Sequence, residues 1–160
     1  MILKIYIAVL SFVLTFMGVT SALGAQKPAA PEKLQFSVEF ILQKVIERKQ
    51  QKYEAQIPTP KIFLESETSL KQFQDAIEPQ WGFRPDQFTN AYVVAKNEIY
   101  LMDEASYYHK VKRCMDDSLA HEFTHFVQSK YQKFDLNDES LEWEAVDVQT
   151  WFRENFCKIP

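Results

Sequence analysis

The chain has 160 residues, of which 46% are hydrophobic and 25% are charged, so one globular domain is expected. Its formal net charge of −4 at pH 7 argues against nucleic acid, and against an anionic membrane surface, as the main partner. The chain has 3 Gly and carries neither G-x-G-x-x-G nor a P-loop, which excludes the usual Gly-rich phosphate loops.

Residues 1–25 have the pattern of a secretory signal peptide. Lys4 precedes an apolar run from Ile5 to Val19, and small residues follow near Ala22 to Ala25. Leu23 interrupts the small-residue cleavage pattern, so an uncleaved membrane anchor is the alternative interpretation. We expect cleavage and export to the periplasm or the exterior, with contact to a membrane only if the segment is retained.

Residues 26–33, "QKPAAPEK", predict a short linker before a domain over residues 34–160. The domain opens with helical spacing of apolar residues between Leu34 and Ile46. A strand from Lys61 to Glu65, a short helix over 67–77 and a turn-rich loop over 78–88 are expected next.

Two short strands, Ala91–Val94 and Glu98–Leu101, are predicted to form a hairpin with a tight turn near Lys96 and Asn97. Residues 113–131 then have a strong helical period, with Asp116 or Asp117 expected to cap the helix, and residues 141–156 form a final amphipathic helix. This order predicts an α+β fold in which a small β-sheet with its hairpin packs on helices.

The stretch "LAHEFTHFVQ" contains His121, Glu122 and His125, which match H-E-x-x-H. Residues four apart lie on the same face of a helix, so both imidazoles can bind one Zn²⁺. A catalytic zinc site needs a third protein ligand and keeps one position for water. Glu122 is placed to take a proton from that water and deliver it to a leaving amine, while zinc polarises the carbonyl.

The alternative is an ordinary helix whose histidines face solvent. The residues around the motif count against it, because Leu119, Ala120, Phe123, Phe126 and Val127 are apolar and predict a largely buried helix. Two histidines on a buried helix need partners, and a metal ion satisfies both.

The third ligand is expected from the last helix. No histidine follows His125, so a three-histidine site is excluded unless His109 contributes. The candidates in the last helix are Glu139, Glu142, Glu144, Asp147 and Glu154. Glu142 and Glu144 point in different directions on a helix, so only one of the two can join the histidines.

"HEFTH" with "EA" in "EWEAVDVQ", 19 residues beyond His125, resembles the gluzincin metallopeptidases. The closest likeness is to small exported bacterial zincin-like proteins with "H-E-x-x-H-x-x-Q" and a closing "E-A-x-x-x-Q", here through Gln128, Ala145 and Gln149. The resemblance implies a zincin-like core, with zinc bound by His121, His125 and Glu144 and with Glu122 as the catalytic acid/base. It also implies that a strand of the hairpin holds an extended peptide by β-pairing.

The sequence departs from the gluzincin pattern at two places. Val148 stands where an aspartate would orient a histidine, with Asp147 one residue early. No His or Tyr follows Glu144 to stabilise an oxyanion. The remaining candidates for that task are Arg153, Tyr92, Tyr100, Tyr107, Tyr108 and His109.

Cys114 and Cys157 are the only cysteines, and in an exported chain such a pair usually forms a disulfide, with two buried free thiols as the alternative. The aromatic residues of the helices are expected mainly in the core; for Trp143, beside Glu144, a place in a substrate pocket is the alternative. The favoured function is an exported, monomeric zinc metallopeptidase that hydrolyses peptide or protein substrates. The alternatives are a zinc-stabilised binding or structural protein with weak or no turnover, and a membrane-anchored module whose histidines bind no metal.

Overall fold

The structure of the chain is a computed structural model that describes residues 30–136 and 138–159. Within these residues it is an α+β fold of five α-helices, one short 3₁₀-helix and three strands. In chain order these are α1 (Val38–Arg48), β1 (Lys61–Leu64), η1 (Glu65–Glu67), α2 (Leu70–Trp81), β2 (Ala91–Val93), β3 (Glu98–Leu101), α3 (Ala105–Val111), α4 (Met115–Lys130) and α5 (Ser140–Phe156). The predicted signal peptide lies outside the described residues, and no helix within them is long and apolar enough to span a membrane.

The three strands form one mixed sheet in the order β1-β3-β2. β1 pairs with β3 in parallel and β2 pairs with β3 antiparallel, so the predicted hairpin is confirmed and β3 is central. Asn97 adopts φ 53° in the hairpin turn, a left-handed conformation that asparagine tolerates.

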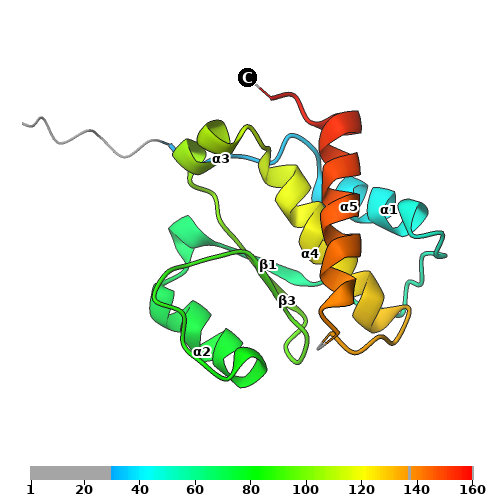
Figure 1. Cartoon of the computed structure of the whole chain (residues 1–160), viewed down its shortest axis with the longest axis horizontal. Coiled ribbons are helices and arrows are strands. Elements are labelled where there is room, and N and C mark those ends of the chain that lie inside the picture. Colours follow the sequence, from blue (N-terminus) through cyan, green and yellow to red (C-terminus); the bar gives the residue numbers. More distant parts are fainter. Residues whose placement is uncertain (1–29, 137, 160) are drawn as a thin grey trace, which may run out of the picture.

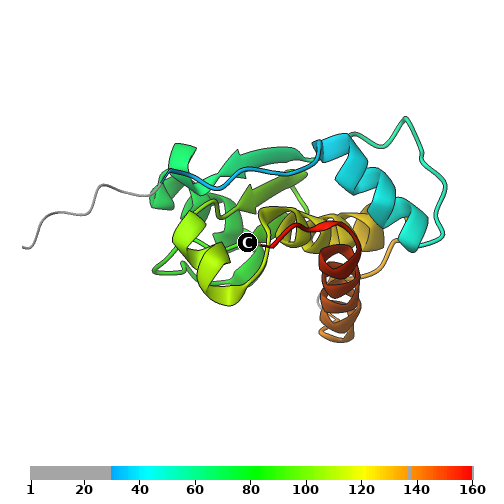
Figure 2. The same ribbon diagram turned by 90° about the horizontal axis from the view of Figure 1, so that it is seen from above.

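Side chains that alternate along the strands separate two apolar clusters, one on each face of the sheet. Tyr92, Ile99 and Leu101 face the larger cluster, which α1, α4 and α5 complete. Ala91, Val93 and Tyr100 face the smaller cluster, which is completed by α2. Helices therefore cover both faces, with α2 on one side of the sheet and α4 with its neighbours on the other (Figures 1 and 2).

Local sequence explains the ends of the first two helices. Ser37 and Ser69 cap α1 and α2, each accepting a hydrogen bond from a backbone N–H in the first turn. α2 ends at Gly82, whose φ of 74° suits glycine. The expected loop from residue 78 is wrong in part, because α2 continues through Pro79 to Trp81 and brings Gln80 beside the sheet.

The N-terminus of α4 also differs from the prediction. Cys114, rather than Asp116 or Asp117, is the N-cap, and its sulfur accepts a hydrogen bond from the backbone N–H of Asp117. The Asp117 carboxylate in turn accepts from the backbone N–H of Cys114, which completes a capping box. This frees the Asp116 carboxylate to accept the backbone N–H groups of Gln35 and Phe36, so it fixes the segment that leads into α1.

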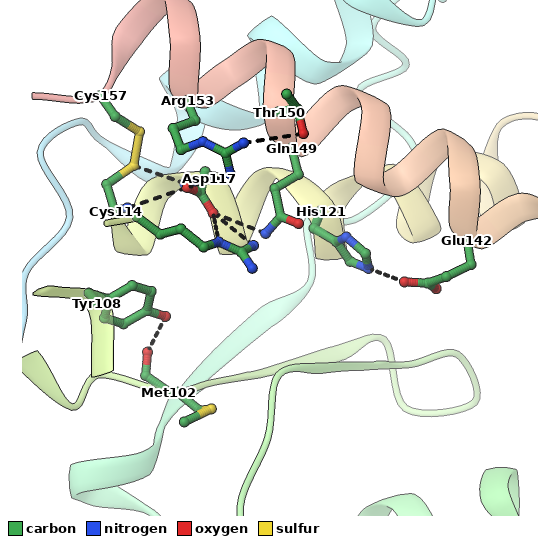
Figure 3. A network of polar contacts seen from close by, with 11 residues as sticks. Met102, Tyr108, Cys114, Asp117, His121, Glu142, Gln149, Thr150, Arg153 and Cys157 are labelled. Carbon is green, nitrogen blue, oxygen red and sulfur yellow. Dashed lines mark hydrogen bonds and ion pairs between the residues drawn. A yellow bond between two sulfur atoms is a disulfide. The ribbon is translucent and has the colours of Figure 1, made fainter. Parts of the chain in front are cut away.

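α5 returns along α4 in the opposite direction. Glu142 in its first turn lies beside His121 and His125, Gln149 contacts Asp117, and the following Cys157 is bonded to Cys114. The expected disulfide is therefore present, and it joins the start of α4 to the residue that follows α5 (Figure 3). The two helices are thus fixed to each other at both ends of their contact.

Candidate metal centre

His121, His125 and Glu142 bring three metal-ligating atoms to one point between α4 and α5. The two Nε2 atoms of the histidines lie 3.1 Å apart. One carboxylate oxygen of Glu142 lies 3.0 Å from Nε2 of His121, and the other lies 3.1 Å from Nε2 of His125. The contact between His121 and Glu142 bridges the two helices in Figure 3.

This arrangement fits a zinc ion in donor type and in spacing. Imidazole nitrogens and a carboxylate oxygen are zinc ligands, at about 2.0–2.2 Å from the ion. Ligands at tetrahedral angles and such distances lie roughly 3.3 Å from one another, close to the observed 3.0–3.1 Å. Three such ligands leave a fourth position open, as in catalytic zinc sites.

The structure brings Glu142, and not Glu144, to the two histidines. Glu144 forms an ion pair with Lys49 and accepts a hydrogen bond from Gln128. The reason lies in the helical geometry, because residues two apart point to different sides of α5. Glu142 continues the stripe of Ala145, Gln149 and Phe152 that faces α4, whereas Glu144 points toward the end of α1.

Gln128 fixes the hydrogen-bonding state of His125. Its side-chain Nε2 donates to the backbone carbonyl of Leu141 at 3.0 Å and to the carboxylate of Glu144 at 2.9 Å. Both of these partners can only accept, so Oε1 of Gln128 must be the atom that lies 2.9 Å from Nδ1 of His125. Nδ1 of His125 therefore donates, and in the neutral ring the Nε2 lone pair points at Glu142 and His121.

Glu144 and Lys49 support this arrangement from behind. The side chain of Lys49 is 4% exposed, and its ammonium group contacts the carboxylate that receives the Gln128 hydrogen bond. Burial acts to raise the pKa of Glu144, but the hydrogen bonds from Lys49 and Gln128 outweigh it and lower this pKa. A charged carboxylate is thus held in place to orient Gln128.

The protonation of the centre reflects the contacts between its ligands. Hydrogen bonds from His121 and His125 lower the pKa of Glu142. Burial acts to lower the pKa of His125, but the hydrogen bond with Glu142 and the charge of Glu122 outweigh it and raise this pKa. Both pKa shifts follow from the hydrogen bonds between Glu142 and the histidines, which a bound metal ion would replace.

Glu122 lies in the cavity that contains the three ligand residues. The cavity has a volume of about 300 Å³, and residues of α2, β2 and α4 contribute to its wall. Glu122 is 4% exposed, and its burial raises the pKa of its carboxyl group against the opposing effect of the nearby histidines. A hydrogen bond with the backbone of Tyr92, in the edge strand, also favours the carboxylate.

A second cavity, of about 420 Å³, adjoins the first and shares His125, Leu136 and Glu142 with it. Trp143 lines this second cavity and is 78% exposed, so the expectation that it lies in the core is wrong. The exposed indole stands beside a ligand residue, where it can contact a bound molecule.

Most residues considered as oxyanion stabilisers lie elsewhere. Of the six candidates, Tyr92 alone lines the metal-centre cavity, and its hydroxyl hydrogen bonds to Asn97 at 2.9 Å. Tyr108 donates to the carbonyl of Met102, and Arg153 contacts Asp117 and Thr150 (Figure 3).

The two remaining residues singled out in the last helix also have other partners. Gln149 donates to the buried carboxylate of Asp117 at 3.0 Å. Asp147 pairs with Arg48 at the surface, so it orients neither histidine. Sequence reasoning assigned neither Gln128 nor Lys49 a role at this site. The signal for Lys49 is a cation at the end of a helix that packs on α4.

Comparison with protein-family models, with curated proteins and with solved structures gave no significant match. The resemblance to gluzincins therefore rests on the residues of the sequence motif.

Proposed function

We propose that the protein is a zinc-dependent peptidase of the gluzincin type, with a zincin-like core. The observation that carries this proposal is the convergence of His121, His125 and Glu142 beside the buried Glu122, in one cavity. It revises the ligand set implied by the sequence resemblance, since Glu142 replaces Glu144 as the third zinc ligand.

In this proposal His121, His125 and Glu142 hold Zn²⁺. The ion supplies Lewis acidity, which makes a water molecule more acidic and polarises a peptide carbonyl. Glu122 accepts the proton of the attacking water and delivers it to the leaving amine. Its buried position favours this role, because burial raises the pKa of the carboxyl group toward the range in which it both accepts and returns a proton.

The proposal includes export and a monomeric state. The pattern of residues 1–25 supports export, and the bonded pair Cys114 and Cys157 agrees with an oxidising compartment. The substrate is a peptide or an unfolded protein segment, since the cavity is open to solvent at the edge of the sheet.

One observation favours a second candidate, a zinc-stabilised exported binding or structural protein with weak or no turnover. The described wall of the cavity contains no cationic side chain and no histidine besides the two ligands, and the Tyr92 hydroxyl is engaged by Asn97. Loss of an oxyanion donor costs orders of magnitude in rate, so binding without turnover is the expected behaviour if no other group replaces it.

The decisive experiment is the cleavage of a peptide library by zinc-loaded protein and by its Glu122→Gln variant, with zinc content measured on both samples. Cleavage by the first protein and its loss in the variant, at equal zinc content, would support the peptidase. Bound zinc without cleavage would support the second candidate. Less than half a zinc ion per chain after full loading would refute both.

A further inference from the structure

The outer edge of β2 is covered by side chains rather than by another strand. β2 is an edge strand, so the backbone groups of Tyr92 point away from the sheet, and the N–H of Val94, the residue after the strand, lies at the same edge. The side-chain Nε2 of Gln80 donates to the carbonyl of Tyr92 at 3.0 Å, and its Oε1 accepts the backbone N–H of Val94 at 3.0 Å. The ammonium group of Lys130 donates to the carbonyl of Val94 at 3.2 Å.

The two hydrogen bonds of Gln80 match those of a paired strand. In a parallel ladder, one residue donates its N–H to a carbonyl of the neighbouring strand and accepts the N–H that lies two residues further along. The carboxamide of Gln80 makes this pair of contacts with Tyr92 and Val94. It therefore takes the place of one backbone residue of an added strand.

Gln80 also lies where two cavities meet. Together with Trp81 and Leu136 it lines both the metal-centre cavity and a neighbouring cavity of about 490 Å³. The 490 Å³ cavity extends along Val94 to the exposed Phe134. Gln80 is exposed, so its side chain can move away from the boundary between these two cavities, which Trp81 and Leu136 also line.

We propose that Gln80 is a specificity-determining residue, whose carboxamide an extended peptide must displace from the edge of β2 in order to bind. This inference rests on the proposed peptidase function. It restricts substrates to chains whose own backbone can make the hydrogen bonds that Gln80 gives up. Such chains are extended segments with free backbone N–H and C=O groups. Folded helices, and peptides methylated at the backbone nitrogens, are excluded.

The size of the effect follows from the exchange of hydrogen bonds. In the native protein a peptide replaces two protein–protein hydrogen bonds, whereas in Gln80→Ala it replaces two hydrogen bonds to water. Removal of the side chain is expected to tighten peptide binding about tenfold. The same gain applies to ground state and transition state, so KM falls while kcat is unchanged. If Gln80 only protects the edge against aggregation, peptide affinity is unchanged.

The test measures binding separately from turnover. Fluorescein-labelled insulin B chain is titrated, by fluorescence anisotropy, against zinc-loaded Glu122→Gln and against the same protein with Gln80→Ala or Gln80→Met added. Gln74→Ala is the matched control, because Gln74 lies on the same helix and donates to the carbonyl of Pro85, outside both cavities. Hydrogen exchange of the Val94 amide is followed in each protein, with and without the peptide.

We expect about tenfold lower dissociation constants in both Gln80 variants and no change for Gln74→Ala. In the Gln80 variants the Val94 amide should exchange faster, and bound peptide should slow this exchange again. Equal affinities in all proteins, or no measurable binding in any, would overturn the proposal. Zinc content is measured on the same samples. A missing metal ion would refute the proposed function, whereas bound zinc without peptide binding would refute only the role of Gln80 at the edge of β2.

Discussion

The Nδ1 atom of His125 lies 2.9 Å from Oε1 of Gln128, and the other two contacts of the Gln128 amide fix this orientation. Replacement of Gln128 by Leu removes the acceptor that holds the imidazole. We expect roughly 10–100-fold weaker zinc binding, the usual cost of losing such a partner. Competition with a chromophoric chelator measures this affinity.

A reciprocal exchange tests the direction of these hydrogen bonds. The double variant Gln128→Glu/Glu144→Gln again places an acceptor beside His125 and a donor on α5, although the carbonyl of Leu141 loses its donor. We expect it to regain a substantial part of the zinc affinity that each single variant loses. Strictly additive losses would contradict the assigned orientation of the Gln128 amide.

Glu142 and Glu144 are expected to differ sharply when each is replaced by Ala. Glu142→Ala removes a proposed ligand and should weaken zinc binding by more than roughly 100-fold, whereas Glu144→Ala acts through Gln128 and should cost about 10–100-fold. Isothermal titration with zinc at fixed pH measures both. A greater loss for Glu144→Ala would return the third ligand to the position that the gluzincin resemblance implied.

The disulfide between Cys114 and Cys157 should stabilise the fold without influencing the metal. The two cysteines are 43 residues apart in sequence, and closing a loop of this length contributes up to about 4 kcal/mol through the unfolded state. We expect Cys114→Ser/Cys157→Ser to lower the free energy of unfolding in urea by 2–4 kcal/mol, in the range of about 2–5 kcal/mol seen for native disulfides.

Two controls accompany this measurement. The intact mass should rise by two hydrogen atoms when the native protein is reduced, and it should stay the same in the variant. Zinc affinity of the folded variant should be unchanged, because Cys157 follows the end of α5 opposite to Glu142.

Asp116 should make part of the stability depend on pH. Its buried carboxylate accepts the backbone N–H groups of Gln35 and Phe36, and burial raises its pKa above the ordinary value of 3.8. The folded protein thus holds this proton more tightly than the unfolded chain. The contribution of this group is complete below pH 3.8 and is lost as the pH rises through its folded pKa.

The matching variant is Asp116→Asn, which does not titrate. The difference in unfolding free energy between the native protein and this variant should therefore be largest in acid and should decrease to a plateau by about pH 7. Urea unfolding at several pH values measures it. A difference that grows with pH would mean that the pKa of Asp116 is lowered, and not raised, by folding.

The periodic parts of the sequence predicted their elements well. The hairpin, the helix with H-E-x-x-H and the last helix lie within a few residues of their expected positions, because each has clear alternation or a clear apolar stripe. α3 was not predicted, and α2 extends beyond its prediction. In both cases tertiary packing stabilises a short helix, one around the buried Tyr108 and the other with Pro79 in its last turn.

The candidate site was predictable only as far as one helix determines it. His121, Glu122 and His125 share a helix, so their relative positions follow from its geometry. The choice between Glu142 and Glu144 depends on the rotation of α5 about its own axis. Contacts distant in sequence set this rotation, among them Lys49 with Glu144 and Gln149 with Asp117.

Glu142, in the first turn of α5, and Glu122 line the same cavity and would together set the charge of a zinc-loaded centre. In the proposed zinc site the two carboxylates would balance a divalent ion bound by two neutral imidazoles, while Lys49 and Glu144 form their own ion pair. An electroneutral centre gives anionic groups such as phosphates no electrostatic advantage over uncharged ones. Such a centre would suit the neutral amide groups of the proposed peptide substrate.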